Sequence, residues 1–166
     1  CRVTIKDTSY SLEELLEDKE LANEYLNGYW LVFRLTVDDY HRYHYIDDGK
    51  IIGNKFINGK FHTVNPIAND YYPIYKQNTR SYTVIESKNF GKMVQMEVGA
   101  MMVGRIVNYP KKQCYRGEEK GYFEFGGSTV VILLKENQAI IDEDIVKNTI
   151  NDKETVVKLG ESIGKK

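Results

Sequence analysis

Several scarcities narrow the kinds of protein that this sequence can encode. Among its 166 residues there are only two cysteines, three prolines and three histidines. Two cysteines cannot form the disulfide framework of a small secreted domain, so a reducing compartment is the simpler expectation. No apolar run approaches the roughly 20 residues that a membrane-spanning helix needs, and no signal-peptide pattern is present.

Charge of either sign is not in excess. The 23 Lys and Arg residues and the 24 Asp and Glu residues leave a formal net charge of −1. A broad basic surface is thereby excluded, and no nucleic-acid partner is expected. Tyrosine, by contrast, is abundant at 13 residues, and it favours strands and half-buried positions. The length fits one domain over residues 1–166.

Segments rich in aromatic and β-branched residues predict a mainly β fold. One short helical region near the N-terminus is predicted by the capping box of Ser11 and Glu14 and by the leucines that follow. It should end at Asn27-Gly28, and Asn58-Gly59 predicts a hairpin turn. The strands are predicted at 1–10, 29–37, 81–87, 92–98, 102–108, 121–125 and 129–134, and residues 56–61 are predicted to form the hairpin itself. We therefore expect an antiparallel β sandwich or a distorted barrel.

The three histidines are the first candidates for chemistry. His41 and His44 lie in Asp-Tyr-His-Arg-Tyr-His at residues 39–44, a spacing that puts them on opposite faces of a strand or on nearby faces of a helical turn. One interpretation is a strand whose polar tips reach solvent. A metal hydrolase that adds His62 is a weaker hypothesis, because no further ligand stands at a recognisable spacing. We therefore predict no metal site.

A second candidate is Phe-Gly-Gly-Ser-Thr at residues 125–129. Paired glycines permit unusual backbone angles and leave the carbonyl of Gly127 open to attack. The same residues fit a glycine bulge between two strands. They do not match the Gly-x-Ser-x-Gly elbow of hydrolases, because Val130 stands two residues after Ser128. The nearby segment 116–123 has the pattern of a charged turn that enters a strand, for which a solvated role is the default expectation.

Taken in order, short segments along the chain resemble the phosphatidylserine decarboxylase family. The resemblance covers nearly the whole sequence and depends on seven segments in register rather than on any one of them. They are Phe-Arg-Leu at 33–35, the histidine segment at 39–44, Val-Asn-Pro at 64–66, Asn-Thr-Arg at 78–80, Val-Gly-Ala with Val-Gly at 98–104, Lys-Gly-Tyr-Phe at 120–123 and Gly-Ser-Thr at 127–129.

The resemblance implies a self-processing enzyme that converts phosphatidylserine to phosphatidylethanolamine. Ser128 would attack the carbonyl of Gly127, and elimination would split the chain into residues 1–127 and 128–166. The remnant of Ser128 would become a pyruvoyl cofactor, which accepts electrons when carbon dioxide leaves. By the same resemblance His44 is the base of the self-cleavage step. His41 is our candidate for the acid that protonates the product.

Other expectations concern substrate, partners and place in the cell. Arg105 and Tyr40 are candidate substrate-binding residues, with Arg105 facing a phosphate or a carboxylate. The family's triad aspartate is expected upstream of Cys1. We expect peripheral binding to the cytoplasmic face of the cell membrane, continued association of the two cleaved pieces, and pairing of two copies. The alternative is an uncleaved, catalytically silent homologue that binds phospholipid headgroups.

Overall fold

A computed structural model describes residues 1–6, 12–59, 78–99, 105–124 and 128–166. The fold is mainly β, as predicted, and all of its strand pairs are antiparallel. The largest sheet has eight strands in the order β12-β1-β2-β10-β6-β5-β4-β8. Its strands, in chain order, are β1 (Arg2–Lys6), β2 (Tyr29–Leu35), β4 (Gly49–Ile57), β5 (Arg80–Ser87), β6 (Gly91–Val98), β8 (Gln113–Cys114), β10 (Ser128–Leu134) and β12 (Thr155–Val156).

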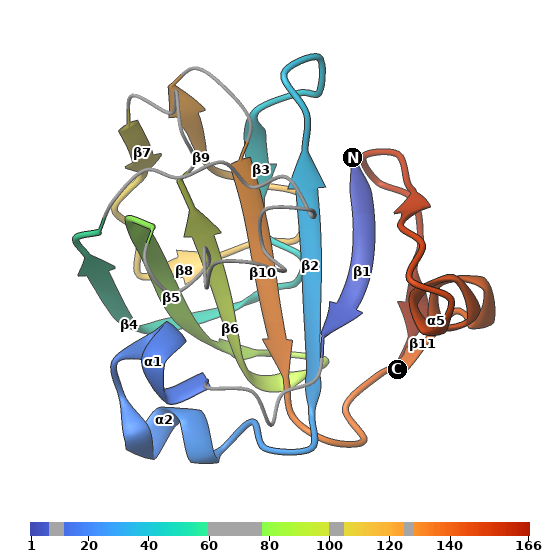
Figure 1. The fold of residues 1–166 in the computed structure, drawn as a ribbon. Helices are drawn as coiled ribbons and strands as arrows, with labels where there is room; N and C mark the ends of the chain where they lie inside the picture. Colours follow the sequence, from blue (N-terminus) through green and yellow to red (C-terminus); the bar gives the residue numbers. More distant parts are fainter. Residues whose placement is uncertain (7–11, 60–77, 100–104, 125–127) are drawn as a thin grey trace.

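A second sheet packs against the first and completes a sandwich (Figure 1). Its order is β3-β9-β7, from β3 (Arg42–His44), β7 (Arg105–Asn108) and β9 (Glu119–Glu124). Buried side chains from both sheets form one core, in which Tyr43 and Phe123 meet Ile132 of the large sheet. The predicted barrel is not formed, because the described strands make open sheets rather than a closed ring.

The other face of the large sheet carries a helical hairpin of α1 (Leu12–Leu16) and α2 (Lys19–Asn23). Its leucines bury against the sheet in a second core. Asp18 caps α2 by accepting a hydrogen bond from Leu21 N at 3.0 Å, a standard way to satisfy the free amides of a helix start. The helix ends at Asn23, four residues before the predicted stop, although Asn27 does have the expected left-handed backbone, with a φ of 65°. Ser11 lies outside the described residues.

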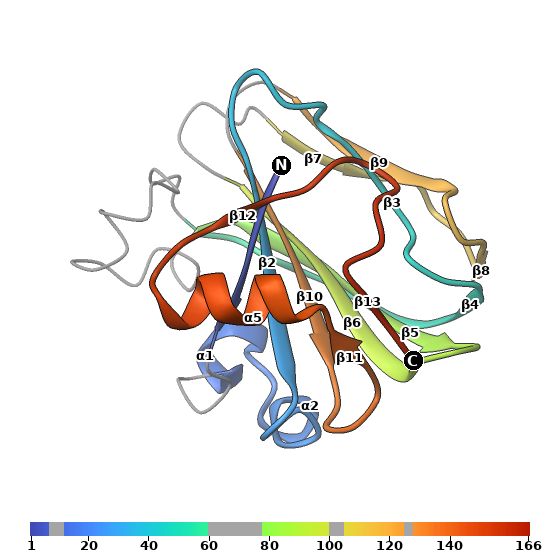
Figure 2. The same ribbon diagram turned by 90° about the vertical axis from the view of Figure 1, so that its right-hand side faces the viewer.

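The C-terminal part differs from the expectation. A helix that the sequence did not predict, α5 (Glu143–Ile150), lies beside β1, and two short strands, β11 (Ile140–Ile141) and β13 (Gly164–Lys165), pair near it (Figure 2). Ile145 is the buried residue of α5, so the helix lacks a long apolar stripe. No helix in the described ranges is long and apolar enough to cross a bilayer.

Strand β10 lies in the interior of the large sheet rather than at its edge. It pairs with β2 from Ser128↔Leu35 to Leu134↔Tyr29, and with β6 from Thr129↔Val98 to Leu133↔Val94. A strand that is hydrogen-bonded along both edges is held more rigidly than an edge strand. The first residue of β10 is paired with β2, and from the second residue onward the strand is held on both sides.

Candidate active site

Ser128 is the first residue of β10, and its backbone lies opposite Leu35 of β2. Gly127 and the side chain of Ser128 lie outside the described part, so the proximity of the serine hydroxyl to either imidazole stays a prediction. The next residue, Thr129, is fully buried, and its Oγ1 has no hydrogen-bond partner among the described groups. A buried hydroxyl without a partner is uncommon and marks a place where a polar group is expected.

His41 lies where the chain enters the small sheet. The turn before it is closed by Asp39, whose carboxylate accepts hydrogen bonds from the amide and hydroxyl of Thr36. The carbonyl of His41 accepts a hydrogen bond from Phe123 N at 3.0 Å, so His41 lies beside the end of β9. Its Nε2 is buried and unpaired among the described residues. A buried ring nitrogen without a partner marks a place where a polar group is expected.

His44 ends β3 at a bulge. The β3–β9 register shifts between Tyr43 and His44, which lies opposite Glu119. The His44 ring stacks on Tyr40 with centroids 6.2 Å apart and an interplanar angle of 19°, and its Nδ1 is a second buried nitrogen without a hydrogen-bond partner among the described groups. A hydrogen bond from Tyr109, the Arg42 guanidinium and the His44 ring together hold the pKa of Glu119 below its usual range.

Arg105 begins β7 and lies opposite Glu124, the last residue of β9. It is exposed. Because β3 and β7 flank β9 on its two sides, the structure brings His41 and Arg105 to the same end of β9. It also brings Tyr40 to His44, as the stacked rings show. Four of the predicted site residues thus lie on or next to the small sheet.

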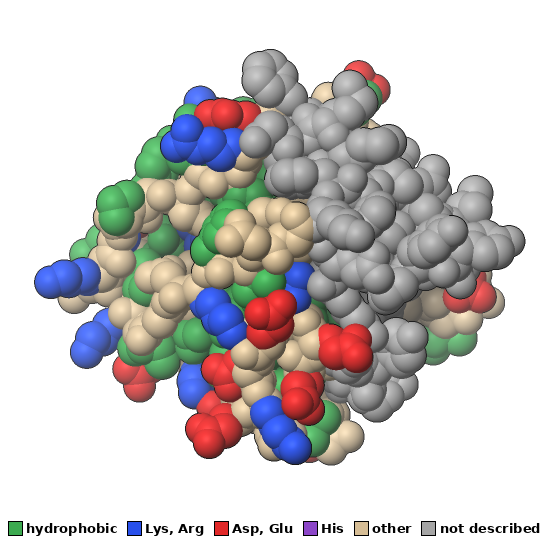
Figure 3. Space-filling view, turned by 60° about the vertical axis from the view of Figure 1, so that its left-hand side comes forward, with side chains coloured by type: hydrophobic (Ala, Val, Ile, Leu, Met, Phe, Trp, Pro, Cys, Tyr) green, Lys and Arg blue, Asp and Glu red, His purple; other side chains and the backbone are tan. Residues whose placement is uncertain are grey.

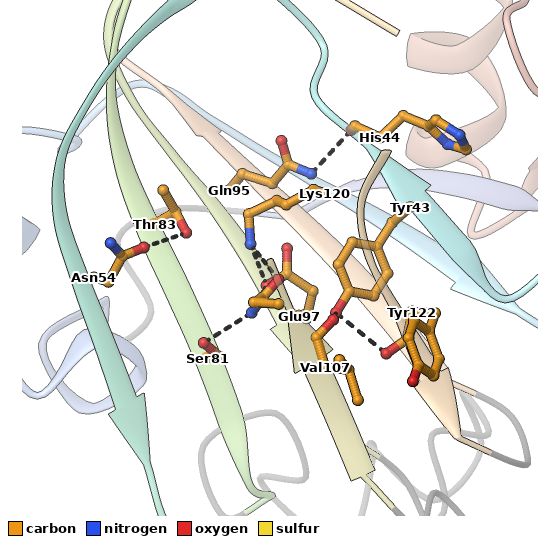
Figure 4. A network of polar contacts seen from close by, with 11 residues as sticks. Tyr43, His44, Asn54, Ser81, Thr83, Gln95, Glu97, Val107, Lys120 and Tyr122 are labelled. Atoms are coloured by element: carbon orange, nitrogen blue, oxygen red, sulfur yellow. Dashed lines mark hydrogen bonds and ion pairs between the residues drawn. The ribbon is translucent and has the colours of Figure 1, made fainter. Parts of the chain in front are cut away.

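The structure contains a buried polar network between the two sheets that the sequence did not predict (Figure 4). Lys120 Nζ lies 2.7 Å from Glu97 Oε2 and 2.8 Å from Asn108 Oδ1, and the Lys120 and Glu97 side chains are 1% and 0% exposed. The solvated role expected for segment 116–123 is therefore wrong for Lys120. The feature of the sequence that could have predicted this network is Glu97, a charged residue between apolar neighbours within a predicted strand. Burial raises the pKa of Glu97 and lowers that of Lys120.

A hollow of about 440 Å³ lies on the opposite side, between α2 and the strands β4 and β5. Three of the charged side chains that line it have partners: Glu24 bridges Lys92 and Lys135, and Lys55 donates to the carbonyl of Leu16. Figure 3 shows acidic and basic side chains mixed over this helical side. The described residues contain no cluster of three His, Cys, Asp or Glu side chains for a metal, and His62 lies outside them.

Comparisons with known proteins agree with the sequence segments. The phosphatidylserine decarboxylase family model matches residues 1–165. The chain is 51% identical over 163 residues to phosphatidylserine decarboxylase proenzyme 2 of Clostridium acetobutylicum, covering 98% of this chain and 56% of that protein. It is 44% identical over 167 residues to the Clostridium perfringens proenzyme, covering 99% and 57%. The chain thus spans just over half the length of these relatives.

Proposed function

Because the chain belongs to the phosphatidylserine decarboxylase family, we propose that it forms the catalytic part of a pyruvoyl-dependent enzyme that converts phosphatidylserine to phosphatidylethanolamine. The observation that carries this proposal is the match over residues 1–165, which includes the Gly127–Ser128 bond and both histidines of the 39–44 segment. The unpaired buried nitrogens of His41 and His44 and the unpaired hydroxyl of Thr129, each judged among the described groups, support a reaction site there.

Self-cleavage is the first chemical step. The hydroxyl of Ser128 attacks the carbonyl carbon of Gly127, and His44 takes the hydroxyl proton. The bond from that carbonyl carbon to the Ser128 nitrogen breaks and the nitrogen takes up a proton, which leaves an ester. Elimination then removes the Cα proton of residue 128 and breaks its Cβ–Oγ bond, which ends the first piece at the Gly127 carboxylate. Water then replaces the nitrogen of residue 128, which leaves as ammonia, and a pyruvoyl group begins the second piece. Glycine at residue 127 leaves the attacked carbonyl without a side chain to shield it.

Decarboxylation follows at the same position. The pyruvoyl group supplies a carbonyl that takes up the substrate amine and accepts the electron pair left by carbon dioxide. His41 donates the proton that replaces the lost carboxyl group. Arg105 binds the lipid phosphate or the serine carboxylate, for which a guanidinium is well suited, and Tyr40 borders the headgroup. Their placement around the end of β9, four residues before Ser128, supports these roles.

The substrate is a membrane lipid, so the enzyme must reach a bilayer. We propose peripheral contact at the cytoplasmic face of the membrane. The turn between β2 and β3 supports this proposal, because Val37 and Tyr40 are 70% and 56% exposed there and precede His41. Apolar and tyrosine side chains of this kind favour the interface of a bilayer.

Intact mass and activity of the full-length protein test the proposal. We expect two pieces that separate between Gly127 and Ser128, the second lighter by one ammonia than the same peptide beginning with serine. Vesicles of phosphatidylserine should release carbon dioxide. Ser128→Ala should stay in one piece and be inactive, whereas Ser162→Ala, a control in the exposed C-terminal segment, should process normally. An uncut wild-type protein that binds such vesicles without releasing carbon dioxide would support the silent lipid-binding homologue instead.

A further inference from the structure

Gln95 links the strand that carries His44 to the large sheet. Its side chain is 1% exposed and lies between the two sheets. The amide Nε2 donates a hydrogen bond to the backbone carbonyl of His44 at 3.1 Å, while Oε1 has no partner among the described groups. The amide therefore makes one directed contact, and Figure 4 shows that contact running from β6 to the end of β3.

The edge position of β3 explains why this carbonyl needs a donor from another strand. In the order β3-β9-β7, β3 has β9 on one side only. His41 O accepts from Phe123 N and Tyr45 N donates to Glu118 O, and the backbone groups of successive strand residues point to opposite edges. The His44 carbonyl is therefore turned away from β9, beside the bulge at which one residue of β9 is left over. A carbonyl without a donor at this place would lose hydration uncompensated, and Gln95 supplies the donor.

The strand that supplies the donor is the neighbour of the strand that begins with Ser128. Gln95 lies opposite Ile132 of β10, and Glu97 lies opposite Val130. Glu97 in turn holds Lys120 of β9 by the buried ion pair. Two successive inward-facing side chains of β6 thus connect both β3 and β9 to the sheet that contains β10.

We propose that Gln95 is a positioning residue for His44. By holding the His44 carbonyl at the bulge, it fixes the backbone from which the imidazole projects, and with it the position of the proposed base. The inference rests on the proposed role of His44 in cleavage at Gly127–Ser128. A displacement of about 1 Å in a catalytic group can cost on the order of 100-fold in rate, so loss of this one bond should be visible in the processing rate.

The test is the rate of self-cleavage of the freshly expressed full-length proenzyme, followed on denaturing gels. Gln95→Leu keeps the volume similar but removes the donor, and we expect processing to slow at least about tenfold. Thr83→Val is the matched control: Thr83 is 2% exposed and lies opposite Gln95, but its hydroxyl bonds Asn54 at 2.8 Å rather than the histidine strand. It should process at close to the wild-type rate.

Gln95→Glu adds a second measurement, the pH dependence of the processing rate, which would not change if Gln95 only stabilised the fold. When the introduced carboxyl is protonated it can donate to the His44 carbonyl, and when it is ionised it cannot. Burial should raise its pKa, so the ratio of the variant's rate to the wild-type rate should be near one at low pH and fall as the pH rises. Dividing by the wild-type rate removes the titration of the histidines from the comparison.

The outcomes separate this inference from the proposed function. A wild-type protein that never cleaves overturns the proposed function and the inference with it. If the wild type cleaves but Gln95→Leu cleaves within about twofold of it, or slows no more than Thr83→Val, the inference alone is wrong. A pH-independent ratio for Gln95→Glu would also overturn it, and this measurement decides the question if Gln95→Leu fails to fold.

Discussion

Glu97 and Lys120 form a buried ion pair that is completed by an amide. Asn108 accepts from the Lys120 ammonium and donates to the same Glu97 oxygen at 3.0 Å, and it also donates to Ser81 at 3.1 Å. Moving two charges out of water costs free energy that their mutual attraction offsets only when the geometry is good. The pair therefore specifies how the two sheets dock, and its loss on one side leaves a bare charge in the core.

Lys120→Met should lower the free energy of unfolding by about 3–5 kcal/mol, because Glu97 would remain buried without its counter-ion. Adding Glu97→Leu to Lys120→Met should recover much of that loss. The matched control is Lys111→Met, which breaks a partly exposed pair with Glu118 and should cost about 1 kcal/mol or less. Urea denaturation of each variant measures these values, and equal losses for Lys120→Met and Lys111→Met would contradict the argument.

Asp47 organises the turn between β5 and β6. Its carboxylate accepts hydrogen bonds from the Ser87 hydroxyl, from Asn89 N at 2.8 Å and from Asn89 Nδ2 at 2.7 Å. Burial alone would raise the pKa of Asp47, but these donors outweigh burial and hold the pKa below its ordinary value of 3.8. The ionised form thus stabilises the fold, and that stabilisation is present above pH 3.8 and is lost as the pH falls through the lowered pKa.

Asp47→Asn should therefore destabilise the protein most at neutral pH. We expect a loss of about 1–3 kcal/mol at about pH 7, and a difference from the wild type that shrinks below about pH 3.8. Denaturant titrations at neutral pH and at about pH 3 measure the two differences. Asp144→Asn, on the exposed side of α5, serves as the comparison and should show little change at either pH. A constant Asp47→Asn effect across this range would refute the assignment.

At the scale of elements, the local sequence pattern predicted most strands but not the contacts that hold one strand to another. Runs such as Thr129–Leu134 and Lys92–Val98 are long and apolar enough to identify β10 and β6. The bulge at His44 and the partner of Gln95 depend on register between distant strands, which no local pattern encodes. Helix α5 was not predicted because its apolar residues are few. The histidines and Ser128 stood out as candidates in the sequence, but their roles came from the family resemblance, which carries no distances.

Arg80 fastens the helical hairpin to β5. Its guanidinium is 2% exposed and donates to the carbonyls of Leu15 at 2.7 Å, Glu14 at 2.8 Å and Asn78 at 3.0 Å. Two of these carbonyls belong to α1, where the last carbonyls of a helix lack partners of their own. Arg80 therefore holds the chain between α1 and α2 at a fixed place over the sheet.

Arg80→Met should unfasten this hairpin. We expect the free energy of unfolding to fall by at least about 2 kcal/mol, since buried carbonyls lose a charged donor, and amide hydrogen exchange to accelerate in residues 12–23 more than in β10. Arg42→Met removes a guanidinium that is 44% exposed and should leave exchange in the hairpin unchanged. If exchange in the hairpin stays at the wild-type rate in Arg80→Met, the fastening role is wrong.

For the whole molecule, the cut at Gly127–Ser128 would divide the large sheet through its middle without separating it. The second piece supplies β10, which is paired along both edges, as well as β12 and α5. The two pieces share both hydrophobic cores, since Ile132 belongs to one and Val131 to the other. Cleavage of one peptide bond leaves all of these contacts in place.

We therefore expect pieces 1–127 and 128–166 to elute together in size-exclusion chromatography and to separate only in denaturant. Unfolding should remain one cooperative transition, because neither piece contains all the strands of the large sheet. Val131→Asp would place an unpaired charge at a fully buried position of β10 and should weaken the association of the pieces, whereas Val156→Asp, at a 68% exposed site, should not. Dissociation of the wild-type pieces in plain buffer would contradict this prediction.

The order in which the ribosome makes the chain gives the central place of β10 a further meaning. Synthesis runs from the N-terminus, so β1 and β2 on one side and β4, β5 and β6 on the other emerge before the strand that joins them. Until residue 134 has left the exit tunnel, the two halves of the sheet have no common neighbour. The bond that we propose to be cut precedes the first residue of that joining strand, so translation would delay such a cut until the halves have met.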